Sequence, residues 1–221
     1  MVGDRVDTAV RKLYSSGYAA LDKGELQEAS RLAARCLRVA RPASYWYFGA
    51  LGLRCWVVNY LGDDEAVERD AASLVAGDTG TDQPWFDGLA HLNLALMHER
   101  RGRQAQAAEH FALAARAYSA CRLEPGQPAE WTLVYEYFAA VSRSRATGDV
   151  SALDAFLSRL AQNESEGGEV EQVSLAARLA LRHARGEDVR DDALEATRAG
   201  ISRALLGPVL LVGQPQGRRA L

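Results

Sequence analysis

Residues 14–41 read YSSGYAALDKGELQEASRLAARCLRVAR and contain two helix-forming stretches separated by a glycine turn. The turn at Gly24 follows an alanine-rich stretch, and glycine supplies the left-handed residue that commonly ends a helix. Beyond the turn, Ala29, Ala33 and Cys36 recur at i, i+4 and i+7, which is the spacing of one helix face. The stretch therefore predicts an antiparallel helix pair with small residues at the contact between the two helices.

Glycine turns of this kind recur along the whole chain. They are centred on Gly24, Gly62, Gly102, Gly148 and Gly186, at separations of 38, 40, 46 and 38 residues. Each turn lies between an Ala-, Leu- or aromatic-rich stretch and a second amphipathic stretch. One such pair cannot bury its apolar face alone, so we expect about five antiparallel helix pairs to stack into a right-handed α-solenoid with a concave inner face.

The composition agrees with an all-α fold and limits the function classes. The 221 residues include 39 Ala and 28 Leu but a single Ile, so helix formers dominate. The net charge of −3 gives no electrostatic footprint for nucleic acid. No apolar run is long enough for a membrane span. The arginine-rich, lysine-poor composition suggests a GC-rich bacterial genome.

The repeated pattern resembles tetratricopeptide repeats. The resemblance is best over residues 14–41, with Gly17, Ala20, the turn at Gly24 and Ala29, and next best over residues 92–117, while the other repeats are degenerate. It implies a superhelix whose first helices line a concave groove that binds a protein or peptide partner without catalysis. A sensor domain of a transcription regulator is an alternative that the resemblance also allows.

Aromatic residues concentrate on the predicted first helices, and a groove rich in Tyr and Trp offers large contact area with polar groups. Helical projection predicts that a mixed set of aromatic, apolar and polar residues points into the groove. The set is Tyr14, Tyr18, Trp56, Asn59, Tyr60, Leu92, Leu96, Glu99, Arg100, Tyr135, Phe138, Ser142 and Arg145. We expect Arg100 and Arg145 to anchor the negative end of a ligand. The alternative is that each arginine only complements the negative end of its own helix dipole.

Motifs for catalysis or cofactor binding are missing from the sequence. It contains no GxGxxG fingerprint, no P-loop lysine motif and no GxSxG turn. His91 and His98 are seven residues apart, which is not the i, i+4 pairing of two metal ligands on a helix. We therefore expect no cofactor, no metal site and no enzymatic activity. A small-molecule-binding protein or enzyme of a bacterial specialised pathway is the alternative.

The remaining expectations concern domains and cellular setting. We expect residues 1–206 to form a single helical-repeat domain, with a partly mobile tail at 207–221 that begins where Pro208 ends the last helix. Three cysteines, an odd number without CxxC spacing, argue against a disulfide framework. The N-terminal stretch lacks the apolar core of a signal peptide, so we expect a cytoplasmic protein.

Overall fold

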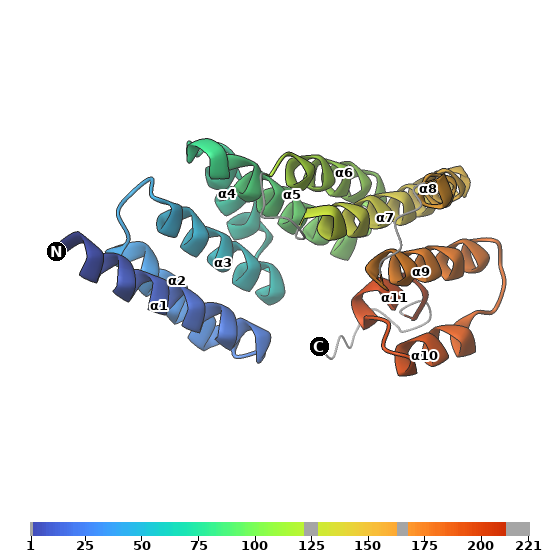
Figure 1. Ribbon diagram of the computed structural model, residues 1–221, viewed down its shortest axis with the longest axis horizontal. Helices are drawn as coiled ribbons and strands as arrows, with labels where there is room; N and C mark the ends of the chain where they lie inside the picture. The colour runs from blue at the N-terminus through green and yellow to red at the C-terminus, as the bar shows by residue number, and fades with distance from the viewer. Residues whose placement is uncertain (1, 122–127, 163–167, 211–221) are drawn as a thin grey trace.

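The computed structural model describes residues 2–121, 128–162 and 168–210, and within these ranges the chain forms helices and no strand (Figure 1). The all-α prediction is therefore confirmed. In chain order the helices are α1 (Val2–Asp22), α2 (Leu26–Val39), α3 (Tyr45–Leu61), α4 (Asp64–Val75), the short 3-10 helix η1 (Gly80–Asp82), α5 (Gln83–Arg100), α6 (Gln104–Ala120), α7 (Pro128–Thr147), α8 (Ser151–Gln162), α9 (Gly168–Ala184), α10 (Arg190–Arg198) and α11 (Arg203–Leu210).

The glycine turns predicted from the sequence have the expected backbone. Gly24, Gly62, Gly102, Gly148 and Gly186 all have φ between 72° and 88°. At Gly62 the backbone N–H donates to the carbonyl of Asn59, which helps to satisfy the free carbonyls at the end of α3. A sixth turn of this type, at Gly200 with φ 99°, separates α10 from α11 and was not predicted.

Consecutive helices pack against one another along the chain. Each short turn brings the next helix back along its predecessor, and the second helix of one pair also packs on the first helix of the next. Direct contacts also join α1 to α3, α3 to α5, and α7 to α9. Ala29, the small residue predicted at a helix contact, is fully buried, and so is Ala107 of α6.

Glycines inside the first helices allow these helices to approach closely. A Cβ added at Gly49 of α3 would lie 2.9 Å from the ring of Tyr14 on α1. A Cβ added at Gly52 would lie 2.2 Å from a methyl carbon of Leu89 on α5. Both distances are too short for a side chain at either glycine without a shift of its neighbour. The glycines thereby set the spacing of the three helices that carry the candidate site.

A buried charge pair joins α3 to α4. The Arg54 guanidinium donates two hydrogen bonds of 2.7 Å to the carboxylate of Asp70, which is completely buried. Arg69 approaches the same carboxylate at 3.5 Å. The buried charge of Asp70 is thus compensated mainly by the two-bond contact with Arg54.

The C-terminal helices form a separate core with α7 and α8. Leu205, Leu206 and Val209 of α11 are buried in it, and the hydroxyl of Tyr137 on α7 donates to the carbonyl of Leu205 at 2.9 Å. The prediction that Pro208 ends the last helix is wrong, because α11 continues to Leu210. The buried face formed by Leu205, Leu206 and Val209 stabilises this extra turn. Residues 211–221, the rest of the predicted tail, lie outside the described residues.

Candidate functional site

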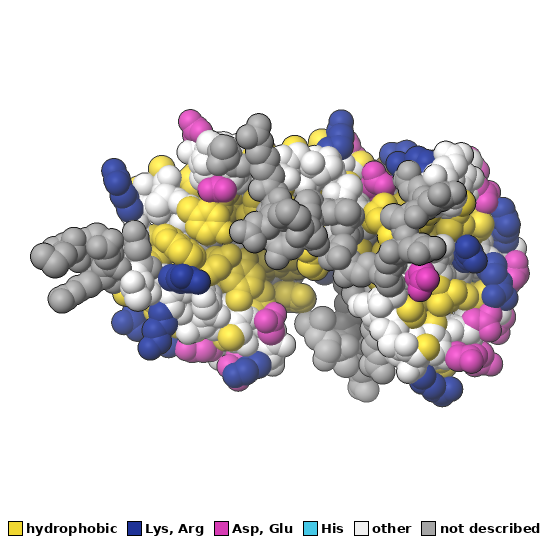
Figure 2. All heavy atoms as spheres, viewed as in Figure 1, with side chains coloured by type: hydrophobic (Ala, Val, Ile, Leu, Met, Phe, Trp, Pro, Cys, Tyr) yellow, Lys and Arg dark blue, Asp and Glu magenta, His cyan; other side chains and the backbone are white. Residues whose placement is uncertain are grey.

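A groove of about 640 Å³ lies between the first helices, and we call it the aromatic groove. Five helices contribute to it: α1, α3, α5, α6 and α7. In Figure 2 hydrophobic side chains are visible on the molecular surface between α1 and α5. The lining residues are Tyr14, Ser15, Tyr18, Ala19, Asp22, Trp56, Trp85, Leu89, Leu92, Tyr118, Trp131 and Tyr135.

The α1 wall of the aromatic groove follows directly from helical spacing. Tyr14, Tyr18 and Asp22 are four residues apart and share one face of α1. The rings of Tyr14 and Tyr18 meet edge to face, with centroids 4.9 Å apart. Asp22 is the last residue of α1, so its carboxylate lies at the end of this wall.

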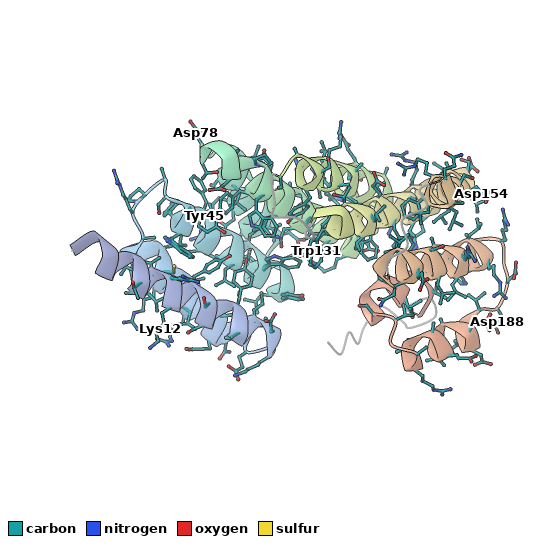
Figure 3. All side chains as sticks on the ribbon, viewed as in Figure 1. Lys12, Tyr45, Asp78, Trp131, Asp154 and Asp188 are labelled. Atoms are coloured by element: carbon teal, nitrogen blue, oxygen red, sulfur yellow. The ribbon has the colours of Figure 1, made fainter. Side chains whose placement is uncertain are left out.

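The opposite wall is a continuous row of rings from α5 to α7. Tyr118 meets the ring of Trp85 edge to face, with centroids 5.2 Å apart, and stacks on Tyr135 at 5.3 Å. Tyr135 in turn stacks on Trp131 at 6.0 Å. Trp131 is 50% exposed and projects from the beginning of α7 toward α1 and α3 (Figure 3). The row therefore runs from a buried centre to an accessible edge.

Tyr118 reaches the aromatic groove although it belongs to the second helix of its pair. Gly88 of α5 makes this possible, because a Cβ at this position would lie 2.8 to 2.9 Å from three atoms of the Tyr118 ring. Without a side chain at Gly88, the ring packs on the backbone of α5 and passes into the groove. The position of Tyr118 thus depends on a glycine thirty residues earlier in the chain.

The phenol groups of the groove are held in the neutral form. Burial raises the pKa of Tyr14 to about 12, and it raises the pKa values of Tyr18, Tyr118 and Tyr135 further. The neighbouring phenols of Tyr135, Tyr18 and Tyr14 also raise the pKa of Tyr118. The groove therefore offers uncharged hydroxyls that can both donate and accept hydrogen bonds.

Asp22 supplies the only charge among the side chains that line the described groove. Its carboxylate is exposed and forms no ion pair with any residue in the described ranges. Arg11 lies on the same face of α1 near the middle of the helix, about 16 Å away from Asp22 along the helix axis. Lys12 points away from the groove (Figure 3). The groove is thus apolar at its centre and negative at the Asp22 end.

The residues predicted from the sequence to line a groove divide into two groups. Tyr14, Tyr18, Trp56, Leu92 and Tyr135 lie together in the aromatic groove. The other eight do not line it. Asn59, Ser142 and Phe138 pack inside the helix layers, and Leu96 packs at the edge of the α5–α6 core. Tyr60 is exposed and stacks on Trp56, whereas Glu99, Arg100 and Arg145 form polar contacts near helix ends.

The two arginines proposed as ligand anchors are engaged by carboxylates of the chain itself. Arg100 forms an ion pair with Asp64 and donates hydrogen bonds to the side-chain and backbone oxygens of Asn59 at 2.6 and 3.0 Å. Arg145 forms an ion pair with Glu99 at 3.2 Å. Arg100 thereby ties the end of α5 to the end of α3 and the beginning of α4.

Seven lining residues were not predicted: Ser15, Ala19, Asp22, Trp85, Leu89, Tyr118 and Trp131. Helical spacing could have found several of them, since Asp22 is four residues after Tyr18, Leu89 is three before Leu92, and Trp131 is four before Tyr135. Tyr118 gave no comparable signal. Its entry depends on the space at Gly88, which only the packed structure reveals.

Three histidines meet at the contact between α5 and α6, and we call His91, His98 and His110 the histidine cluster. The Nδ1 atoms of His91 and His110 are 3.2 Å apart, and the rings of His98 and His110 stack with centroids 5.3 Å apart. Burial lowers the pKa of each imidazole below its ordinary value of 6.5, and the two neighbouring imidazoles lower that of His110 further. The cluster is therefore adapted to neutral imidazoles.

The described residues contain neither a candidate metal site nor a candidate membrane span. No group of three or more His, Cys, Asp or Glu side chains is placed to hold a metal ion in the part of the chain that the structure describes. None of its helices combines the length and apolar character needed to cross a bilayer.

Comparison with known proteins leaves the functional assignment to the geometry. No family model, curated protein or solved structure matches the chain.

Proposed function

We propose that the chain is a non-catalytic helical-repeat protein that binds an extended peptide segment of a protein partner in the aromatic groove. Five glycine turns between helices, and the direct packing of α1 on α3 and of α3 on α5, support a right-handed solenoid of the tetratricopeptide type. Free cysteines and the Arg-rich composition favour a cytoplasmic bacterial setting.

The observation that carries this proposal is the convergence of seven aromatic side chains from five helices on one accessible surface. Tyr and Trp side chains offer large contact area with few rotatable bonds, and they dominate the energetics of protein interfaces. Exposed Ser15, Asp22 and Trp131 at the groove edge leave a surface that a chain segment can enter from outside. Neutral phenols can pair with the peptide groups of such a segment.

Selection of peptides from a random displayed library tests the proposal. We expect the selected peptides to share a motif, to change the tryptophan fluorescence of the protein, and to bind at least tenfold more weakly to Trp131→Ala, about 1.4 kcal/mol. Since Trp131 is half-exposed, this variant retains its fold. Leu194→Ala, at an exposed apolar residue of α10 outside the groove lining, is the control. Selected peptides that bind both variants as well as the wild type would refute a peptide function for the groove.

A small-molecule ligand is the second candidate, and the groove volume favours it. About 640 Å³ lies within the range of roughly 300–1,000 Å³ that is typical of small-molecule sites. Native mass spectrometry of the purified protein distinguishes the two functions. A copurified compound that is lost in Trp131→Ala and that blocks the selected peptides would establish the small molecule as the ligand.

A further inference from the structure

The chemistry of the aromatic groove discriminates between possible peptide side chains. The faces of aromatic rings carry negative electrostatic potential and attract cations, most strongly for Trp. Trp56, Trp85 and Trp131 all line the groove, together with four tyrosines. The ring faces of such a surface attract a cationic or planar side chain and repel a carboxylate.

Full charges in the groove act in the same direction. Asp22 is exposed, lies at one end of the groove and has no ion-pair partner in the described ranges, so its carboxylate is available to a ligand. Arg100 and Arg145, which would otherwise attract an acidic ligand, are paired with Asp64 and Glu99 and do not line the groove, and Asp64 also pairs with Arg101. Asp22 contributes the negative charge at its end of the groove lining.

Hydrogen-bond acceptors complete the arrangement. The hydroxyls of Tyr14 and Tyr18 lie on the α1 wall, and those of Tyr118 and Tyr135 lie on the opposite wall. A guanidinium has five N–H donors in one plane and stacks on aromatic faces, whereas an ammonium is a compact charge that is strongly hydrated. Arginine therefore matches the rings, the phenol oxygens and the carboxylate together, and lysine matches only the charge.

We propose that the peptide segment bound in the aromatic groove presents an arginine side chain, whose guanidinium stacks between the groove aromatics and pairs with Asp22. This inference rests on the proposed function, since it names the side chain that the groove recognises. The cationic end of the ligand lies at the Asp22 end of the groove, distant from Arg11.

Capped peptides that differ only at a central residue test the proposal. The central residue is Arg, Lys, Gln, Leu or Glu, and the flanking residues are uncharged and identical. Binding is followed by intrinsic fluorescence, because three of the four tryptophans line the groove. We expect the Arg peptide to bind at least fivefold more tightly than the Gln and Leu peptides, the Lys peptide to be intermediate, and the Glu peptide to be weakest.

Two variants with matched controls locate the recognition. Asp22→Asn should lower the affinity for the Arg peptide at least threefold and leave the affinity for the Leu peptide unchanged. Glu25→Gln, at an exposed carboxylate outside the groove lining, should change neither of these two affinities. Trp131→Leu should reduce the preference for the Arg peptide over the Leu peptide, whereas Leu194→Ala on α10 should not. Raised salt should reduce the preference for Arg over Gln.

The outcomes separate this inference from the proposed function. If the Leu or Gln peptide binds as tightly as the Arg peptide, or if Asp22→Asn changes nothing, arginine recognition is wrong while peptide binding stands. If methylguanidinium alone binds as tightly as the Arg peptide, a small cation is the ligand, and the peptide segment is wrong. If none of the peptides changes the groove fluorescence, and library selection yields no groove-dependent binder, both proposals fail.

Discussion

Replacement of Gly88 by alanine tests how the aromatic groove is built. The new Cβ would lie 2.8 to 2.9 Å from three ring atoms of Tyr118. That ring cannot easily move away, because Trp85 and Tyr135 hold it on two sides and it is only 3% exposed. Overpacking of this kind costs about 1–3 kcal/mol. Alanine gains about 0.5–1 kcal/mol over glycine inside a helix, so we expect a net loss of up to about 2.5 kcal/mol.

A double-mutant cycle isolates the contact between the two side chains. In a Tyr118→Ala background the obstacle is gone, and Gly88→Ala should then stabilise the protein by about 0.5–1 kcal/mol through helix propensity alone. The sign of the Gly88→Ala effect thus reverses between the two backgrounds. Urea unfolding followed by far-ultraviolet circular dichroism measures the four free energies of unfolding.

Tryptophan fluorescence reports the effect on the groove itself. Displacement of Tyr118 should shift the emission of the native protein, because the ring contacts Trp85 directly. Refutation would come from a Gly88→Ala variant that is more stable than the wild type in both backgrounds and keeps its emission spectrum. Such a result would mean that Tyr118 does not pack against the α5 backbone.

Three further expectations follow from buried groups. Arg54→Ala leaves Asp70 fully buried beside only the weaker contact with Arg69, and should lower the free energy of unfolding by about 2–4 kcal/mol in urea titration; a loss below about 1 kcal/mol would contradict the pairing. The histidine cluster has lowered pKa values in the folded state, so its contribution to stability is present above pH 6.5 and is lost as the pH falls through the folded-state pKa values. The free energy of unfolding should therefore decline less between pH 7.5 and pH 5.5 in His110→Gln than in the wild type. Ala107→Leu should destabilise by about 1–3 kcal/mol, whereas Ala105→Leu, at an exposed position of the same helix, should be near neutral in thermal unfolding.

Local backbone chemistry was the most predictable part of this protein. The five predicted glycine turns have left-handed glycines because each helix pair needs a residue that ends one helix and reverses the chain. Such a signal is contained in a few adjacent residues and survives any change in tertiary packing. Pro208 shows the limit of the same reasoning. The prediction considered only the destabilising effect of a proline on its own helix. The burial of Leu206 and Val209 against α7 to α9 outweighs that effect.

The candidate site was less predictable because it depends on pairs of distant residues. Helical projection places a side chain on a face, but it does not say which faces meet. Asn59 was predicted to face the groove, yet it is buried, where it donates to the backbone and side chain of Asn93. Tyr118 belongs to the second helix of its pair and lines the groove because Gly88 leaves room for it.

Ion pairs between residues that are distant in the sequence determine the charge of the groove. Arg100 and Arg145 stand near the ends of predicted first helices, and on sequence alone they suggest a positively charged groove. Folding brings Asp64 to Arg100 and Glu99 to Arg145, so both arginines are paired with carboxylates outside the groove lining, although Asp64 is shared with Arg101. Asp22, which the projection overlooked, is left as the exposed charge among the groove residues. The ligand preference that follows is the opposite of the one expected from the arginines: a cation belongs in this groove, because a carboxylate there would meet aromatic faces and the like charge of Asp22.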